Sequence, residues 1–313
     1  MKKFFYLSVF VFMLSVFGTA VFSDDGIVIG AGTYDDNGYK LNYRYYLPED
    51  ADTVSYPVVL YLHTAGERGN DNSSQLNYGL PLLLFRYGII EDYPAIYIFP
   101  QAGTDEKWVD VEWSDGVYST ADTPETPSLA AAIDLTLSAA EKDNGDSSRI
   151  YVTGISMGGY GSWDCVSRHP DLFAAAVPIC GGGDPGSAEA ISHTPVRAYH
   201  GDLDNVVPIS GDLQLSEKLS DIGADAELTV IPGGDHFNIW QFAYEDSLDW
   251  MFSQRKESAA DIKPSAEIHV SERYSKPAAV IAVLAGIGLL VLFSFIAYKL
   301  FYLLAMHYLN NKR

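Results

Sequence analysis

Gly154-Ile155-Ser156-Met157-Gly158-Gly159 is the stretch that decides how this sequence folds. It follows an apolar run, Arg149 to Thr153, that is typical of a buried strand, and it precedes the helix-compatible stretch Tyr160 to Arg168. The glycines on both sides of the serine permit a sharp turn that keeps the serine oxygen exposed. An ordinary strand-to-helix turn is the alternative. The strand, turn and helix around Ser156 favour a nucleophile at the tip of this turn.

Serine is a weak nucleophile unless a base takes its proton, so a histidine and a carboxylate are needed. In a strand–turn–helix arrangement of this kind we expect them in the chain order Ser, Asp or Glu, His. His236 fits the base, because Gly233-Gly234-Asp235-His236-Phe237 is a flexible loop just past the last predicted strand. His63 and His200 end strands, where we expect them to brace loops through hydrogen bonds. His169 is expected to cap a helix end.

Two aspartates compete for the role of the acid. The strand Val196 to His200 runs into Gly201-Asp202-Leu203-Asp204-Asn205-Val206-Val207-Pro208. Asp204 lies deeper in the turn, before an apolar segment, whereas Asp202 is placed to stabilise the turn itself. We therefore predict that Asp204 orients His236 and stabilises its charged form without accepting the proton.

Stabilising the oxyanion of an acyl-transfer reaction takes two main-chain N–H donors. One is expected from Met157, directly after the serine, and the other from the loop that follows an early strand, Tyr61 to Gly69.

Short apolar runs alternate with longer helical patterns through the body of the chain, which predicts a mostly parallel, doubly wound α/β sheet with helices on both faces. The expected strands are Leu41 to Tyr46, Pro57 to Leu62, Ala95 to Phe99, Ile150 to Thr153, Ala174 to Ile179, Val196 to His200 and Glu227 to Ile231. A helix is expected over Ser128 to Glu141. Since no linker interrupts residues 24–255, we expect one catalytic domain there.

Several of these segments carry a resemblance. His63-Thr64-Ala65-Gly66-Glu67-Arg68-Gly69-Asn70-Asp71, the Ser156 turn, His200-Gly201-Asp202-Leu203-Asp204 and Gly233-Gly234-Asp235-His236 resemble the α/β-hydrolase superfamily. Within it they are similar to secreted esterases, grouped with feruloyl and acetylxylan esterases, polyhydroxybutyrate depolymerases and predicted peptidases. The resemblance implies Ser156 as nucleophile, Asp204 as acid, His236 as base, and main-chain donors at Ala65 and Met157.

One residue departs from the pattern of this superfamily. Its members usually have His-Gly where this chain has His63-Thr64. A glycine adopts backbone angles that a β-branched residue resists, so a reshaped oxyanion loop is expected.

The two ends of the chain read as targeting and membrane segments. Residues 1–23 have the layout of a signal peptide, with Lys2 and Lys3 before an apolar run and small residues. Residues 278–298 carry no charge and are long enough to span a bilayer. Residues 256–277 are expected to be a juxtamembrane linker, and residues 299–313 a cytoplasmic tail by the positive-inside rule. These segments predict a single-pass membrane protein with an extracellular catalytic domain.

The charge of the body excludes polyanionic partners. Residues 24–276 hold 15 basic against 41 acidic residues, a formal net charge of −26, which repels nucleic acid and anionic lipid headgroups. No segment shows metal-ligand spacing or a cofactor fingerprint, so neither a metal nor a cofactor is expected. The two cysteines, Cys165 and Cys180, suit either a disulfide or two small buried residues.

These observations predict a membrane-anchored extracellular serine hydrolase of carboxylic esters, small or linked to polysaccharide, with feruloyl and acetyl esters as substrates by analogy. A serine peptidase of the same fold is one alternative. Another is a catalytically silent surface binding protein on a hydrolase scaffold, an idea motivated by Thr64 and by the membrane segment.

Overall fold

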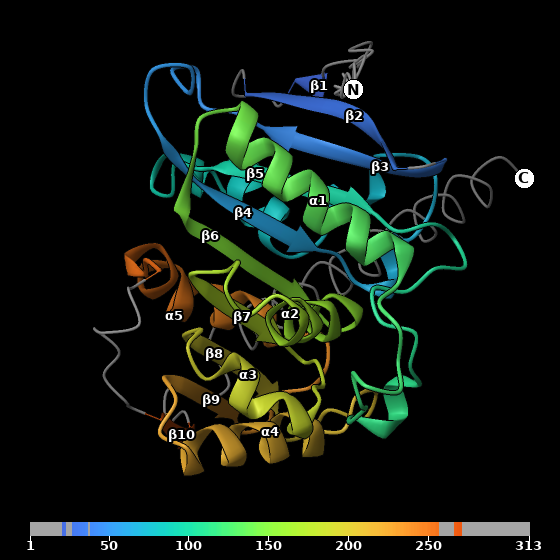
Figure 1. Ribbon diagram of the computed structural model, residues 1–313, viewed down its shortest axis with the longest axis vertical. Coiled ribbons are helices and arrows are strands. Elements are labelled where there is room, and N and C mark those ends of the chain that lie inside the picture. Colours follow the sequence, from blue (N-terminus) through green and yellow to red (C-terminus); the bar gives the residue numbers. More distant parts are fainter. Residues whose placement is uncertain (1–20, 23–26, 37, 257–265, 271–313) are drawn as a thin grey trace, which may run out of the picture. The chain divides into compact units, whose positions relative to one another are not determined.

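The computed structural model describes residues 21–22, 27–36, 38–256 and 266–270, which build one ten-stranded sheet with helices on both faces (Figure 1). The strands are β1 (Val21–Phe22), β2 (Val28–Asp36), β3 (Tyr39–Tyr46), β4 (Tyr56–Leu62), β5 (Ile96–Gln101), β6 (Gly145–Ile155), β7 (Ala175–Ile179), β8 (Val196–Gly201), β9 (Ala226–Ile231) and β10 (Ala266–Val270). The α-helices are α1 (Pro127–Lys142), α2 (Met157–Arg168), α3 (Ala188–Ile191), α4 (Ser210–Asp221) and α5 (Trp240–Ser253).

The strand order is β1-β2-β3-β5-β4-β6-β7-β8-β9-β10. Strands β1, β2, β3 and β5 pair antiparallel, and every pair from β5 through β4 to β10 is parallel. Successive contacts link α1 to α2, α2 to α3 and α3 to α4 on one face, while α5 packs behind β6, β7 and β8 (Figure 1). The predicted doubly wound, mostly parallel sheet is confirmed.

The order of the strands reverses at β4. The chain passes from β4 to β5 on one side and then crosses to β6 on the other side of β4. In open α/β sheets, ligands bind beyond the carboxyl ends of the strands at such a switch point. The loops that follow β4 and β6 carry the predicted oxyanion residues and Ser156, so the sheet places them at this position.

All seven expected strands and the expected helix are present, with small differences at their ends. Thr126 caps helix α1, because its side chain accepts a hydrogen bond from the Leu129 N–H, and Pro127 fits the first helical position. Strand β2 was not expected, because Gly30 and Gly32 dilute its apolar pattern. In the sheet these glycines pair with Tyr45 and Tyr43 of β3, whose rings occupy the space that a side chain would fill.

The sheet extends beyond the expected domain at both ends. Strand β1 lies in the expected signal segment, and β10, which pairs with β9, lies in the expected linker. The sequence of β10 alternates apolar and polar residues, a pattern typical of a strand. The rest of the signal segment, the span at 278–298 and the tail at 299–313 lie outside the described residues. Within the described part of the chain, no helix has the length and apolar character needed to cross a bilayer.

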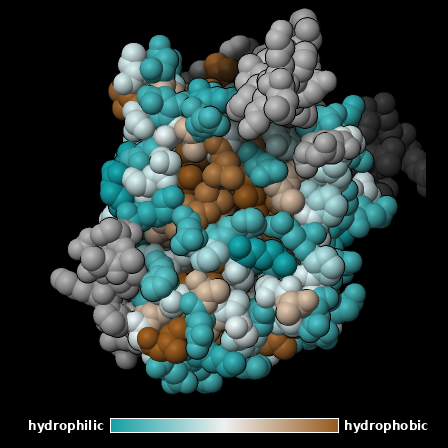
Figure 2. Space-filling view, viewed as in Figure 1, coloured by the Kyte–Doolittle hydropathy of each residue, from teal (hydrophilic) through white to brown (hydrophobic). Residues whose placement is uncertain are grey.

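The core is formed by the apolar side chains of the sheet and of the helices that cover it, including Leu60, Val152, Trp163 and Ala198, each fully buried. Figure 2 shows that the face carrying α1 is mostly hydrophilic, with apolar surface near its centre. This distribution agrees with the strongly acidic composition of residues 24–276.

Candidate active site

Ser156 lies between β6 and α2 in a backbone conformation that residues other than glycine rarely adopt. Its φ is 59° and its ψ is −116°, so the turn holds the residue in a strained backbone region, as a nucleophile elbow does. The strand β4 approaches this turn closely. A Cβ atom on Gly158 would lie 1.8 Å from the Leu62 carbonyl oxygen, and one on Gly154 would lie 2.5 Å from the same oxygen. Only glycine fits at these two positions.

The structure brings Ser156, His236 and Asp204 into one chain of hydrogen bonds. The Ser156 hydroxyl donates to His236 Nε2 over 2.8 Å, and His236 Nδ1 donates to Asp204 Oδ2 over 2.6 Å. The three residues come from the loops after β6, β9 and β8, which meet at the carboxyl edge of the sheet. Ser156 is 8% exposed and His236 5% exposed, so the hydroxyl and the imidazole lie just below the surface.

Hydrogen bonds between the loops fix the distance from Asp204 to His236. The Leu203 N–H donates to the Gly234 carbonyl over 2.9 Å, and the Asp202 N–H donates to the Ile231 carbonyl over 3.2 Å. Asp202 Oδ1 accepts from the Gly233 N–H over 2.6 Å. Asp202 therefore stabilises the turn, as the sequence indicates, while Asp204 lies against the histidine.

Asp204 is held as a carboxylate. Burial opposes its ionisation, but hydrogen bonds from His200, His236 and the Val207 and Val206 N–H groups outweigh burial and hold the pKa of the carboxyl well below its usual range. An ionised carboxylate at Nδ1 keeps His236 in the tautomer whose Nε2 accepts the serine proton.

Ala65 and Met157 are each the first residue of a helical turn, Ala65–Glu67 and α2 respectively. The N–H of such a residue has no acceptor within its own helix. The start of α2 lies close to the loop after β4, because a Cβ on Gly158 would be 3.1 Å from the His63 carbonyl oxygen. The two predicted oxyanion donors thus belong to adjacent turns, and their role stays a prediction.

Thr64 adopts an extended conformation, with φ −77° and ψ 173°, that suits a β-branched residue. Its hydroxyl accepts from the Gly66 N–H over 3.2 Å, and Glu67 Oε2 accepts from the Thr64 N–H over 2.9 Å. This capping box stabilises the turn that begins at Ala65. Thr64 thus occupies an allowed backbone region, and the reshaping of the oxyanion loop stays a prediction.

His63 supports the same loop from beneath, as its sequence position indicates. Its Nδ1 donates to the Thr64 carbonyl over 2.6 Å, and its Nε2 accepts from the Ala102 N–H over 3.0 Å. The His63 carbonyl accepts from the Trp108 indole over 3.0 Å. Burial lowers the pKa of His63 to about 4, so the imidazole is neutral and structural.

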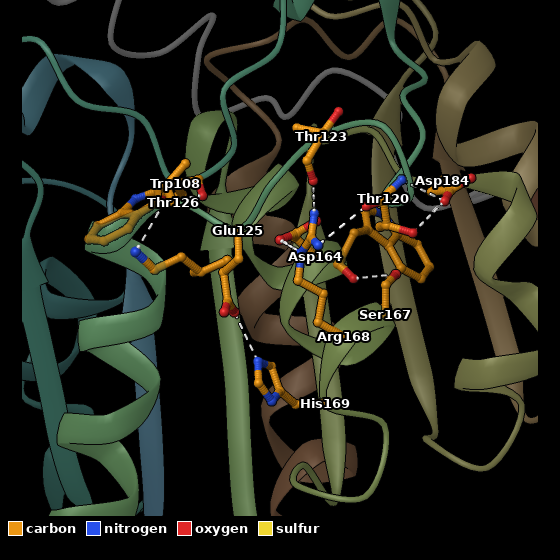
Figure 3. Close-up of polar contacts among 12 residues, drawn as sticks. Trp108, Thr120, Thr123, Glu125, Thr126, Asp164, Ser167, Arg168, His169 and Asp184 are labelled. Atoms are coloured by element: carbon orange, nitrogen blue, oxygen red, sulfur yellow. Dashed lines mark hydrogen bonds and ion pairs between the residues drawn. The ribbon is translucent and has the colours of Figure 1, made fainter.

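A second polar network fastens the segment before α1 to the end of α2 (Figure 3). The Arg168 guanidinium pairs with the buried Asp164 over 2.7 Å and donates to the Thr120 and Thr123 carbonyls. Asp184 accepts from Thr120, and His169, which ends α2, pairs with Glu125 over 2.9 Å. The preceding part of this segment reaches the Ser156 turn, because the Tyr160 hydroxyl donates to the Trp113 carbonyl over 2.9 Å.

Cys180, Asp204 and His236 form a group that the sequence spacing does not reveal, because its members come from three separate loops. Their sulfur, oxygen and nitrogen ligand atoms lie within 4.8 Å of one another, close enough to hold a metal ion. Both Asp204 oxygens already accept hydrogen bonds, and burial and the nearby Asp204 and Asp212 charges raise the pKa of the Cys180 thiol. The contacts therefore favour a protonated thiol against the triad over a metal ligand.

The cysteines do not form the disulfide that the sequence left open. Cys165 and Cys180 are both free and buried. Sequence reasoning also missed Asp212 and Trp163, which contact the loop of the acid through His200. Asp212 lies on α4 and Trp163 on α2, so no local pattern connects them with Asp204.

The comparisons with known proteins agree with this geometry. Residues 109–262, which include Ser156, Asp204 and His236, match the dienelactone hydrolase family. Feruloyl esterase B of Thermothelomyces thermophilus is 26% identical over 162 residues, 52% of this chain and 51% of that protein. The chain thus spans about half the length of this curated relative.

Two solved esterase structures are also similar to this chain. A thermostable esterase is 30% identical, with a TM-score of 0.64 over 75% of this chain and 70% of that chain. A feruloyl esterase module from Clostridium thermocellum, complexed with sinapinate, is 16% identical, with a TM-score of 0.51 over 80% of this chain and 98% of that chain. The second likeness concerns the fold alone.

Proposed function

The chain belongs to the α/β-hydrolase superfamily, among esterases, and on that premise we propose that it hydrolyses carboxylic esters with Ser156 as nucleophile, His236 as base and Asp204 as acid. The observation that carries the proposal is the hydrogen-bonded chain from Ser156 Oγ through His236 to Asp204. The strained backbone at Ser156 supports it, because strain of this kind persists where the fold presents a reacting group.

The reaction follows from the positions of these atoms. Ser156 Oγ attacks the ester carbonyl carbon while His236 Nε2 takes its proton, and the N–H groups of Ala65 and Met157 bind the developing oxyanion. Collapse of the tetrahedral intermediate breaks the bond to the alkoxide, which leaves with the proton from His236. Water then gives a proton to His236 and attacks the acyl-enzyme. The second intermediate breaks its bond to Ser156 Oγ, which takes the proton back from His236, and the acid is released.

The substrate and the location belong to the same proposal. We propose feruloyl or acetyl esters, free or on polysaccharide, because the relatives that match this chain include a feruloyl esterase. We also propose that residues 1–23 direct export and that residues 278–298 anchor the chain in the cell membrane, with the catalytic domain outside. Two observations had favoured the alternative of a catalytically silent binding protein, Thr64 and the membrane segment. Thr64 no longer supports it, because this residue adopts an unstrained backbone conformation.

Hydrolysis of chromogenic esters by the full chain tests the reaction. Acetyl, butyryl and feruloyl esters should be turned over, and unmodified peptides should not. Ser156→Ala should abolish turnover, while Ser167→Ala, which removes a half-buried hydroxyl elsewhere on α2, should retain it. Peptide cleavage without ester turnover would transfer the assignment to the peptidase alternative. A folded wild type that hydrolyses neither substrate would contradict the proposal.

A further inference from the structure

Two histidines share the carboxylate of Asp204. Asp204 Oδ2 lies 2.6 Å from His236 Nδ1 and 3.3 Å from His200 Nε2. Asp204 Oδ1 accepts from the N–H groups of Val206 and Val207, each over 2.9 Å. The acid is therefore enclosed by donors on every side, and one of them is a second imidazole that the proposed reaction does not use.

Both nitrogens of His200 face acceptors. Nδ1 lies 2.7 Å from Asp212 Oδ2, and Nε2 lies 3.0 Å from the Val207 carbonyl oxygen as well as close to Asp204. A neutral imidazole has a single N–H, so only the charged form satisfies both sides. The side chain is fully buried. Burial disfavours the charge, but the hydrogen bonds to Asp204 and Asp212 outweigh burial and raise the pKa of His200 to about 9.

A hydrogen bond from helix α2 holds the side chain of Asp212 in place. It lies in the first turn of α4, fully buried, and its Oδ1 accepts from the Trp163 indole of α2 over 2.7 Å. Its two oxygens thus connect α2 with the end of β8. This arrangement holds His200 in one orientation beside Asp204.

Two further titratable groups near His200 and its acids, Tyr160 and Cys180, carry no charge at neutral pH in the described part of the chain. Burial and the charges of Asp212 and Asp204 raise the pKa of Tyr160 on α2, and burial likewise raises that of the Cys180 thiol after β7. The charged members are then His200, Asp204 and Asp212, together with His236 when it is protonated. At neutral pH the two buried anions are balanced by one cation, His200.

We propose that His200 is a positioning residue for the reaction, a fixed imidazolium that keeps Asp204 ionised and oriented and thereby sets the pH range in which His236 acts as a base. The inference rests on the proposed function. A positive charge beside Asp204 opposes proton uptake by His236, so it extends activity toward lower pH.

The role of His200 can be tested by changing the balance of charge among His200, Asp204 and Asp212. His200→Asn leaves two uncompensated buried anions, which favour protonation of His236. The acidic limb of the kcat/KM profile should move up by about one pH unit. Adding Asp212→Asn to His200→Asn removes the extra anion and should return the limb toward that of the wild type. A purely structural role for His200 predicts the opposite, since a second lost partner adds to the damage.

His169→Gln is the matched control. It removes another titrating, carboxylate-paired histidine, outside the triad, and should leave the acidic limb in place. All profiles are measured on the full chain, from about pH 5 to about pH 10, with ester hydrolysis as the readout. An acidic limb that His200→Asn does not move, or that the double variant displaces further, would overturn the proposal.

The wild-type protein offers a readout that needs neither a folded variant nor activity. In the full chain labelled with nitrogen-15 histidine, the nitrogen shifts of His200 should report a doubly protonated ring at about pH 8. A neutral ring at this pH would overturn the inference even if esters are hydrolysed. A charged His200 in a chain without hydrolase activity would instead confirm the charge on His200 and contradict the proposed function.

Discussion

At the scale of single residues, the sequence predicts the triad because each member has a local signature. Ser156 lies between glycines after a strand, His236 lies in a glycine-rich loop, and Asp204 lies in the turn after β8. The sequence does not predict the surroundings of Asp204. Asp212 on α4 hydrogen-bonds to His200, and Trp163 on α2 hydrogen-bonds to Asp212, so their link to the acid through His200 arises only when the sheet brings the helices together.

The two aspartates of the loop after β8 should behave differently. Asp204→Asn removes the charge that holds the tautomer of His236 and should lower kcat by about 10³- to 10⁴-fold. Asp202→Asn is the matched control, because it weakens only the hydrogen bond to the Gly233 N–H and should change kcat much less. Steady-state hydrolysis of a chromogenic ester measures both. Equal losses in the two variants would show that the assignment of the acid is wrong.

At the scale of elements, the capping box of the turn Ala65–Glu67 positions a predicted oxyanion donor. Thr64→Gly removes the hydroxyl that accepts from the Gly66 N–H, and it adds backbone freedom. We expect kcat to fall by about 2-fold, because replacing a capping threonine with glycine costs only a few tenths of a kcal/mol. Thr64→Ser keeps the hydroxyl and should retain most of the activity. An unchanged kcat in Thr64→Gly would show that the capping box of this turn does not contribute to the reaction.

The ion pair between Arg168 and Asp164 should contribute to stability far more than the more accessible pair between Arg149 and Asp146. Arg168→Leu leaves a buried carboxylate unpaired and should lower the free energy of unfolding by about 3–5 kcal/mol. Arg149→Leu breaks the more accessible pair with Asp146 and should cost about 1 kcal/mol or less. Chemical denaturation of the two variants compares them. Equal costs would mean that burial of Asp164 does not govern the effect.

Two strands, β2 and β10, could not be predicted from the sequence. Strand β2 escapes prediction because Gly30 and Gly32 carry no apolar side chain, and only the rings of Tyr45 and Tyr43 across the sheet explain their place. Strand β10 lies within a stretch whose charges and proline suggest a linker. Its five residues alternate apolar and polar, but so short a pattern does not say where the strand pairs; pairing with β9 supplies the reason for both its position and its direction.

At the scale of the whole molecule, residues 278–298 are predicted to anchor an acidic extracellular body. The full chain, expressed in cells, should stay with the membrane after alkaline extraction, and deletion of residues 278–313 should release it to the soluble fraction. Replacing only the tail at 299–313 with a neutral sequence is the control, because it preserves the apolar segment. Release of the full chain by alkaline extraction would exclude the predicted anchor.

In the whole molecule, we infer, the fold activates one serine, Ser156. The most direct measurement is the reaction of the full chain with a fluorophosphonate probe, followed by mass spectrometry of the labelled peptide. We expect a single adduct on Ser156, which is lost in Ser156→Ala and in His236→Ala and retained in Ser167→Ala. A folded wild type that takes up no probe, or an adduct on a different serine, would contradict it.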